Sequence, residues 1–319
     1  MSLDHVKNLE RLKDTFTNVG EELRKTIIGQ EEIVKQILVA MLTGSNALLE
    51  SPPGLGKTTM IKSIAEVLDL RFSRIQHTPD LMPSDITGTY VIEETEGKKR
   101  FIFQQGPIFA NIVLADEINR ATPKTQAALL EAMQEKQVTV GTETFKLEEP
   151  FFVLATQNPI DQEGTYPLPE AQVDRFLLKI LVDYPSEQEE LTIINQYTVA
   201  EEKPRIQKLL GEKSILLLQK LVRQVPIADD IKMRVVRIIQ KTRTTPELIE
   251  YGASPRASIG LILAAKAHAL IEGRKFVSNK DVDAMAPAVL RHRIVLSFAA
   301  EREGKTPDTV IQQLLQSTK

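Results

Sequence analysis

The sequence predicts an α/β domain built on a parallel sheet of five strands, followed by an all-α domain. Short apolar runs alternate with helical patterns in the first part of the chain, as in parallel α/β sheets. Strand patterns end after Pro185, and only helical patterns follow. The length of 319 residues exceeds one typical domain of about 150 residues. We therefore expect an α/β domain over residues 1–184 and a helical domain over residues 185–319.

Each predicted element rests on a local pattern of apolar and turn residues. Helical spacing in the first domain predicts helices over residues 3–25, 30–42, 58–68 and 123–134. Short apolar runs predict buried strands over residues 47–49, 71–76, 111–115, 151–155 and 177–182. Paired runs around turns predict two hairpins, 90–92 with 101–103 around residues 96–98, and 138–140 with 144–147 around Gly141. Helical spacing in the second domain predicts helices over residues 187–200, 211–224, 228–241, 255–272, 279–290 and 306–316.

Composition excludes several classes of protein and site. Hydrophobic residues make up 42% and charged residues 26%, so the chain can bury a core and is neither disordered nor fibrous. The net charge of −3 gives no signal for nucleic acid. Without Cys there is no disulfide, thiolate metal site or Cys nucleophile, and the four His form no close metal-ligand pair. No apolar run approaches the ~18 residues of a membrane span, so we expect a soluble, cytoplasmic protein.

A glycine-rich segment between the first strand and the next helix predicts a phosphate-binding loop. Residues 51–58 read Ser-Pro-Pro-Gly-Leu-Gly-Lys-Thr. The backbone N–H groups of such a Walker A loop, with the helix N-terminus, cradle an anion, and Gly54 and Gly56 allow close approach. Lys57 would reach the β- and γ-phosphates, and the Thr58 hydroxyl would ligate Mg²⁺. Ser51 replaces the usual first glycine, which is tolerated if that position does not need a positive φ.

Polar residues follow two more of the apolar strands. Asp116 and Glu117 end the strand at 111–115, and the carboxyl ends of parallel strands share one edge with the loop. Asp116 would hold Mg²⁺ through its water shell, and Glu117 would orient the attacking water or accept its proton. Asn158 would orient that water or contact the γ-phosphate, although Asn-Pro is also a common turn initiator.

Three arginines are candidates for stabilising transition-state charge. Arg175 precedes the last strand, Arg120 follows the acidic pair, and Arg256 begins a helix of the second domain. An arginine supplied by a neighbouring copy can raise a hydrolysis rate by ~10³–10⁵. Each arginine taken alone is more often part of a surface ion pair, so these assignments depend on family context.

Together these motifs resemble the MoxR family of AAA+ ATPases. The matching stretches are LLESPPGLGKT (48–58), DLMPSDITG (80–88), GPIFANIVLADEINRATPKTQAALLEAMQE (106–135), ATQNPIDQEGTYPLPEAQVDRF (155–176) and SPRAS (254–258). The resemblance implies an AAA+ P-loop core, a C-terminal helical lid, and ATP and Mg²⁺ as cofactors. The two hairpins fall where this clade carries its helix-2 insert and its pre-sensor-1 insert.

The resemblance also implies a role for each site residue. Residues 27–30, with Ile28 and Gly29, border the adenine. The nucleotide is bound by Gly54, Leu55, Gly56, Lys57, Thr58 and Thr59, with Thr58 and Asp116 on the metal side. Glu117 completes Walker B, Asn158 is sensor 1, Arg175 is the arginine finger, and Arg256 is the sensor 2 arginine, acting within one subunit or across an interface.

Members of this family are usually chaperone-like ATPases, often hexameric, that act with a partner carrying a von Willebrand factor A domain. The resemblance therefore implies Mg²⁺-dependent ATP hydrolysis at a ring interface, used to remodel or mature a partner protein complex. One alternative is a motor acting on nucleic acid, which the acidic second hairpin, with Glu143, Glu148 and Glu149, argues against. A second alternative is a nucleotide-gated scaffold without catalysis, which Glu117 argues against.

Overall fold

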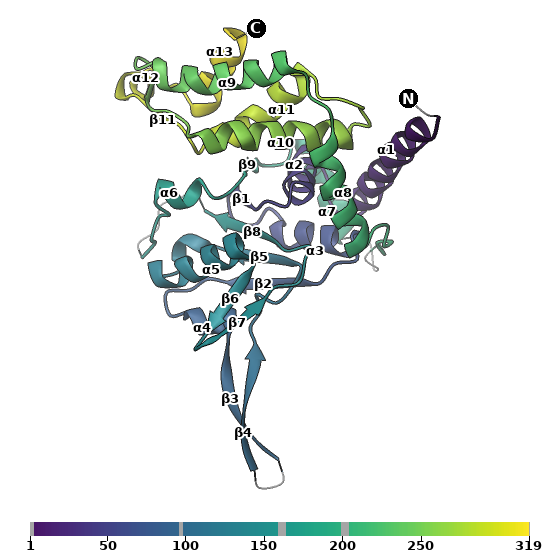
Figure 1. The fold of residues 1–319 in the computed structure, drawn as a ribbon, viewed down its shortest axis with the longest axis vertical. Coiled ribbons are helices and arrows are strands. Elements are labelled where there is room, and N and C mark those ends of the chain that lie inside the picture. The colour runs from purple at the N-terminus through teal and green to yellow at the C-terminus, as the bar shows by residue number, and fades with distance from the viewer. Residues whose placement is uncertain (1–2, 96–97, 159–163, 199–203, 319) are drawn as a thin grey trace.

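Five parallel strands form the centre of the fold (Figure 1). The computed structural model describes residues 3–95, 98–158, 164–198 and 204–318. The strands lie in the order β2-β5-β8-β1-β9, and each pair of neighbours is parallel. Their bounds are β1 (Ala47–Glu50), β2 (Phe72–Gln76), β5 (Ile112–Asp116), β8 (Phe152–Gln157) and β9 (Leu178–Leu181). The predicted five-stranded parallel sheet is confirmed.

The strands read as apolar runs because both faces of the sheet are covered. β5 is buried along its whole length. Its residues alternate between two hydrophobic clusters, with Ile112 and Leu114 in one and Val113 and Ala115 in the other. Strand periodicity thus divides one apolar sequence between the two faces.

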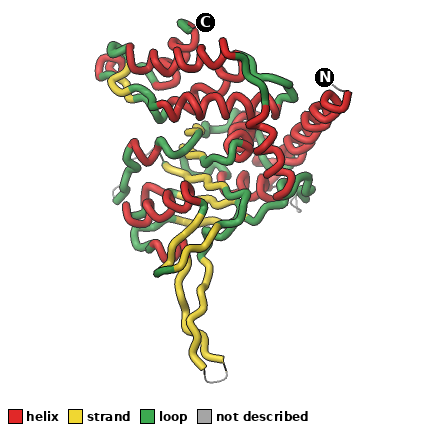
Figure 2. Tube along the Cα trace, viewed as in Figure 1, coloured by secondary structure: helices red, strands yellow, loops and turns green. Residues whose placement is uncertain are grey.

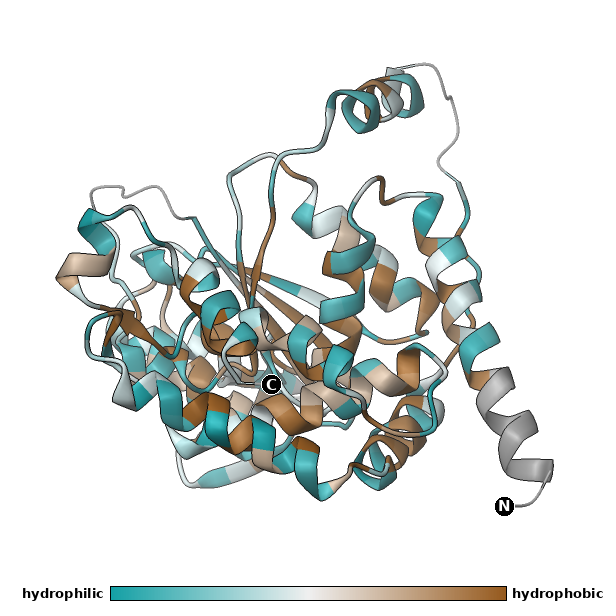
Figure 3. Ribbon diagram, turned by 90° about the horizontal axis from the view of Figure 1, so that it is seen from above, coloured by the Kyte–Doolittle hydropathy of each residue, from teal (hydrophilic) through white to brown (hydrophobic). Residues whose placement is uncertain are grey.

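Helices cover both faces of the sheet (Figure 2). The helices of this part are α1 (Leu3–Arg24), α2 (Glu31–Leu42), α3 (Lys57–Val67), α4 (Pro83–Thr87), η1 (Ile118–Arg120), α5 (Pro123–Glu135) and α6 (Glu170–Val173). Ile61 and Ile64 of α3 pack in the cluster of Ile112, whereas Leu129 of α5 packs in the cluster of Val113. Figure 3 shows the apolar strands lying between these helices. α4, η1 and α6 are too short to give a periodic signal and were not predicted.

Two hairpins project from the sheet region, as predicted. The first, β3 (Gly88–Thr95) with β4 (Lys98–Gln105), is longer than expected and is called the arm below (Figure 1). The second is β6 (Gln137–Val140) with β7 (Glu143–Lys146). At the root of the arm, Phe103 stacks on Phe145 with ring centroids 4.0 Å apart. Farther out, the cross-strand pair of Ile92 and Phe101 is exposed, whereas the predicted turn residues Glu96 and Gly97 lie outside the described residues.

The C-terminal part is helical, as predicted. Its helices are α7 (Glu187–Thr198), α8 (Glu212–Gln224), α9 (Asp229–Thr244), α10 (Pro255–Ile271), α11 (Asn279–Leu290), α12 (Phe298–Arg302) and α13 (Pro307–Gln316). It also contains β10 (Ile249–Tyr251) paired antiparallel with β11 (Val295–Leu296), two strands too short to show alternation. The last two residues of the helix predicted over 187–200 lie outside the described part of the chain. No described helix is both long and apolar enough to cross a membrane.

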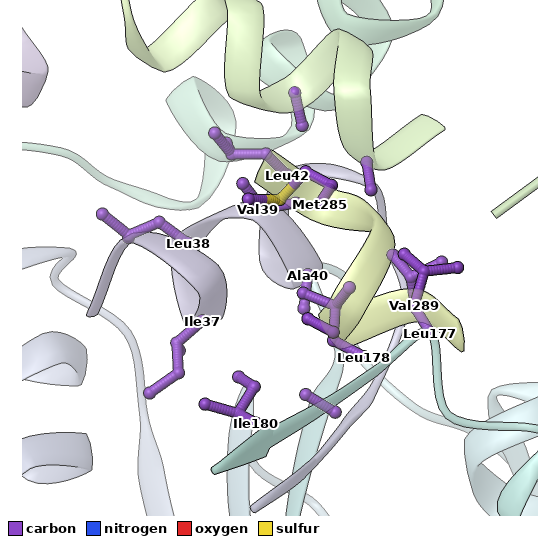
Figure 4. Packing of buried hydrophobic residues seen from close by; sticks show 14 of the residues in the cluster. Ile37, Leu38, Val39, Ala40, Leu42, Leu177, Leu178, Ile180, Met285 and Val289 are labelled. Atoms are coloured by element: carbon purple, nitrogen blue, oxygen red, sulfur yellow. The ribbon is translucent and has the colours of Figure 1, made fainter. Parts of the chain in front are cut away.

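The lid shares a hydrophobic core with one face of the sheet. α2 lies between them, and its residues from Ile37 to Leu42 meet both partners (Figure 4). Leu178 and Ile180 of β9 lie near α2, and so does Met285 of α11, whereas Val289 of α11 lies beside Leu177 (Figure 4). A motion of the lid against the sheet therefore has to rearrange this apolar contact.

A buried carboxylate stabilises the lid from within. Asp281 is fully buried; its Oδ1 lies 2.7 Å from His268 Nδ1 and also pairs with Arg274. Its Oδ2 accepts hydrogen bonds from Ser278 N at 2.8 Å and Ser278 Oγ at 2.7 Å, which caps α11. Burial acts to raise the pKa of Asp281, but the hydrogen bonds from His268 and Ser278 and the charge of Arg274 outweigh it and lower the pKa to about 2.

We expect Asp281→Asn to lower the free energy of unfolding by about 2 kcal/mol at pH 7. The folded pKa lies below the ordinary 3.8, so the ionised carboxylate contributes stability above pH 4 that is lost as the pH falls toward 2. Urea unfolding at pH 7 and pH 3 measures this, with the exposed Asp229→Asn as a control that should change little. A wild-type advantage of equal size at both pH values would contradict the prediction.

Candidate functional site

The glycine-rich loop follows the carboxyl end of β1 and leads directly into α3. Gly54 and Gly56 adopt φ values of +85° and +69°, which residues other than glycine rarely adopt. Ser51 is fully buried, and its backbone is not among the positive-φ residues. Its Oγ donates to Pro52 O at 2.8 Å. The loop therefore accommodates a serine at this position, as the sequence argument required.

Lys57 contacts the loop backbone and interacts electrostatically with the acidic pair Asp116 and Glu117. Its Nζ donates to Ser51 O at 3.3 Å and to Pro52 O at 3.4 Å. Burial lowers the pKa of Lys57, and the nearby charges of Asp116 and Glu117 oppose that shift. The ammonium and the two carboxylates thus act on one another across a single site.

Asp116, the last residue of β5, is held from both neighbouring strands. Its Oδ1 accepts a hydrogen bond from Thr156 Oγ1 of β8 at 2.6 Å. Its Oδ2 accepts one from Arg74 Nη2 of β2 at 2.6 Å. Sequence reasoning missed Arg74 and Thr156, because each is a single polar residue within a strand pattern. Their signal is a polar side chain near the carboxyl end of a strand that flanks an acidic pair.

Glu117 adopts a left-handed backbone with φ of 55°, which is uncommon outside glycine. Its N–H donates to Thr156 Oγ1 at 2.9 Å. Its Oε2 accepts hydrogen bonds from Gln76 Nε2 at 3.0 Å and from Arg120 Nη1 at 2.8 Å. Arg120 therefore pairs with Glu117 of its own chain. Asn158 follows β8 at the same edge of the sheet, because β5 and β8 are neighbouring parallel strands.

A cavity of about 480 Å³ adjoins the loop. One side is formed by the loop and α3, including Gly54, Leu55, Gly56 and Thr59, and another by Ile27, Ile28 and Gln30. Tyr184, just before the helical part, and Tyr197 of α7 also line the cavity, and the sequence did not predict either residue there. Aromatic and aliphatic walls of this kind suit a flat base.

Gly29 lies beside this cavity wall and admits a close neighbour. Its φ is +70°, and a Cβ built there would clash with the side chain of Glu189 of α7. A side chain at this position would therefore strain the backbone and force the Glu189 side chain to move.

The oxygen donors next to the loop fit Mg²⁺ bound together with a nucleotide. Within the described residues, no group of three or more His, Cys, Asp or Glu could hold a metal alone. Mg²⁺ commonly takes one or two protein oxygens and completes its shell with phosphate oxygens and water. The Thr58 hydroxyl at the start of α3 and the Asp116 carboxylate are such donors.

Arg175 and Arg256 lie at the end of the sheet where the parallel strands begin, opposite the end that carries the phosphate loop. Leu177 N donates to Asn46 O at 2.8 Å, which places the segment before β9 beside the start of β1. Both arginines are exposed and line a hollow of about 240 Å³ there. β1 runs from this edge to the loop, so one chain does not bring these arginines together with its own Lys57.

Comparisons with known proteins agree with this architecture. Residues 46–178 match the family described as ATPase family associated with various cellular activities (AAA), and residues 241–314 match the AAA lid domain. The protein named Chaperone MoxR1 of Mycobacterium tuberculosis (strain ATCC 25618 / H37Rv) is 44% identical over 304 residues, covering 93% of this chain and 80% of that protein. YeaC of Bacillus subtilis (strain 168) is 43% identical over 310 residues, covering 97% and 96%. The crystal structure of a putative ATPase from Cytophaga hutchinsonii ATCC 33406 superposes with a TM-score of 0.91 at 38% identity, covering 98% and 97%.

We expect Thr156→Val to destabilise the protein by about 1–3 kcal/mol. Valine keeps the shape but leaves Glu117 N–H without its acceptor and Asp116 without one donor, at a fully buried position. Denaturant unfolding measures the loss. Thr192→Val is the matched control, because Thr192 is exposed and its hydroxyl donates to the carbonyl of Gln188 in its own helix. Equal stabilities of wild type and Thr156→Val would contradict this account of the acidic pair.

Proposed function

The chain belongs to the MoxR family of AAA+ ATPases, and we propose that it binds ATP with Mg²⁺ and hydrolyses it between neighbouring copies. One observation carries the proposal. The loop and acidic pair lie at one edge of the sheet, whereas Arg175 and Arg256 lie at the other. Each chain then offers two half-sites, and a complete site needs two chains.

The binding half-site takes the nucleotide along the loop. The triphosphate lies on the loop amides and the N-terminus of α3, with Lys57 on its terminal phosphates. The base enters the cavity between Ile28 and the rings of Tyr184 and Tyr197. Thr58 and Asp116 would hold Mg²⁺, which would neutralise phosphate charge. Arg74 forms an ion pair with Asp116 at 2.6 Å, and a metal bound to Asp116 would compete with this contact.

Hydrolysis uses the groups around Glu117. Its carboxylate orients the attacking water and accepts a proton, and Asn158 at the next strand end fixes the same water. Gln76 and Arg120 both donate to Glu117 Oε2, which fixes the orientation of the carboxylate.

The second half-site supplies positive charge to the neighbour. Arg175 is the arginine finger and Arg256 acts as sensor 2 across the interface, since both are exposed on the face away from their own loop. A ring, hexameric as in related proteins, gives every loop a neighbour's arginines.

The work of the ring is the remodelling of a partner protein. The chaperone name of the relative MoxR1 and the exposed apolar pair Ile92 and Phe101 on the arm support a protein client. The family resemblance points to a partner that carries a von Willebrand factor A domain. Co-purification from the source cell identifies that partner.

Glu117→Gln should lower kcat for ATP by about 10²-fold or more, because glutamine is not a general base. Nucleotide affinity should change little, since Glu117 does not line the base cavity. Steady-state phosphate release with Mg²⁺, and titration with a fluorescent ATP analogue, measure the two quantities. Near-zero and equal rates in wild type and variant would instead favour a nucleotide-gated scaffold.

Activity per chain should rise with protein concentration, because a lone chain lacks the neighbour's arginines. At a concentration where sedimentation shows rings, Arg175→Ala should lose about 10³-fold or more in kcat and still form rings. Lys305→Ala, which removes a half-buried cation paired with Glu303 in the segment after α12, serves as the control. Comparable rates in Arg175→Ala and wild type would remove Arg175 from the site.

A further inference from the structure

We propose that Arg293 of the lid and Asp174 form a clamp that positions the arginine finger Arg175. The inference rests on the proposed function, in which Arg175 serves a neighbouring copy. In addition, the lid fixes the position of the Arg175 guanidinium relative to the nucleotide of the neighbouring copy through this clamp. Arg293 and Asp174 are positioning residues, because they touch Arg175's own backbone segment and not the nucleotide.

The guanidinium of Arg293 donates hydrogen bonds to the backbone on both sides of Arg175. Its side chain is only 4% exposed, and its Nε lies 2.7 Å from Asp174 Oδ1. Nη2 donates to Asp174 O at 3.2 Å and to Phe176 O at 2.6 Å. Nη1 donates to Leu177 O at 2.9 Å. Carbonyls immediately before and after Arg175 are thus held by one rigid planar group.

The other oxygen of Asp174 reaches a second part of the lid. Asp174 Oδ2 accepts a hydrogen bond from Ser254 Oγ at 3.3 Å and lies 3.5 Å from Arg256 Nη1. Ser254 and Arg256 stand at the N-terminus of α10, whereas Arg293 follows α11. One carboxylate therefore ties two lid elements to the segment that carries the finger.

The clamp leaves the finger itself available. Arg175 is exposed and lines the hollow of about 240 Å³ together with Arg256. The side chain of Arg175 is therefore accessible although Arg293 holds the backbone on both sides of it. Charge-assisted hydrogen bonds in a buried place hold their geometry well. A displacement of about 1 Å in a catalytic group can cost about 10²-fold in rate, so fixing this backbone matters to the neighbour's reaction.

Mixed rings separate a positioning defect from a folding defect. Asp174→Asn keeps its own phosphate loop and loses finger placement, so it should bind ATP normally and hydrolyse it at least about tenfold more slowly. Lys57→Ala has a dead loop and an intact finger. Mixing the two in equal amounts should restore hydrolysis, because an Asp174→Asn loop then meets a Lys57→Ala finger.

Two mixtures and one variant serve as controls. Arg175→Ala with Lys57→Ala should regain activity in the same way, whereas Glu117→Gln with Lys57→Ala should not, since both defects lie in the same half-site. Asp308→Asn breaks the lid ion pair with Arg291, 2.8 Å apart in the native chain, without touching the finger segment, and should keep wild-type activity. Arg293→Lys, which retains the charge but not the planar fork, should behave like Asp174→Asn and stands in for it if that variant does not fold.

The outcomes discriminate. Rescue of Arg175→Ala but of neither clamp variant would overturn the clamp and leave the shared site intact. Failure to rescue Arg175→Ala would overturn the shared site and the clamp with it. An equal loss of activity in Asp308→Asn would show that any damage to the lid slows hydrolysis, which also defeats the inference.

Discussion

The parallel pairing of β1 with β8 and β9 is the constraint on which the rest of the structure depends. β1 has 4 residues, and it separates the phosphate loop at its carboxyl end from the arginine segment at its amino end. A parallel sheet sends every carboxyl end to one edge, so the acidic pair and Asn158 join the loop. The same rule sends the start of β9, with Arg175, to the other edge. In the proposed function, each chain therefore carries the two halves of a site at opposite ends of its strands.

The acidic edge is organised by neutralisation of charge. Two carboxylates stand close together, and each has a cation and a neutral hydrogen-bond partner from an adjacent strand or turn. Arg74 and Thr156 serve Asp116, whereas Arg120 and Gln76 serve Glu117. These hydrogen bonds and ion pairs provide partners for both carboxylates, and in the proposed function some of them are exchanged when a nucleotide binds.

Much of the fold followed from the sequence, because long periodic segments and buried strands leave clear patterns. The sheet, the hairpins and the helical lid were predicted on that basis, and Ser51 fits its place as expected. Short elements such as β10 and β11 carry too few residues to show a period. Partners from other strands, such as Arg74, and the cavity wall at Tyr197 depend on tertiary contacts. Sequence placed Arg256 at the start of a helix, but only the fold shows which edge of the sheet it faces.

The stacking of Phe103 on Phe145 connects the root of the arm to the second hairpin, so that the two hairpins contact each other directly. The chain runs from Glu117 through η1 and α5 to Lys136, whose left-handed φ of 50° turns it directly into β6. A tilt of α5 would therefore be carried through the aromatic stack to the arm, which extends away from the sheet (Figure 1). Because Ile92 and Phe101 pair farther from the root than Phe103, such a tilt would displace them more than it displaces the stack.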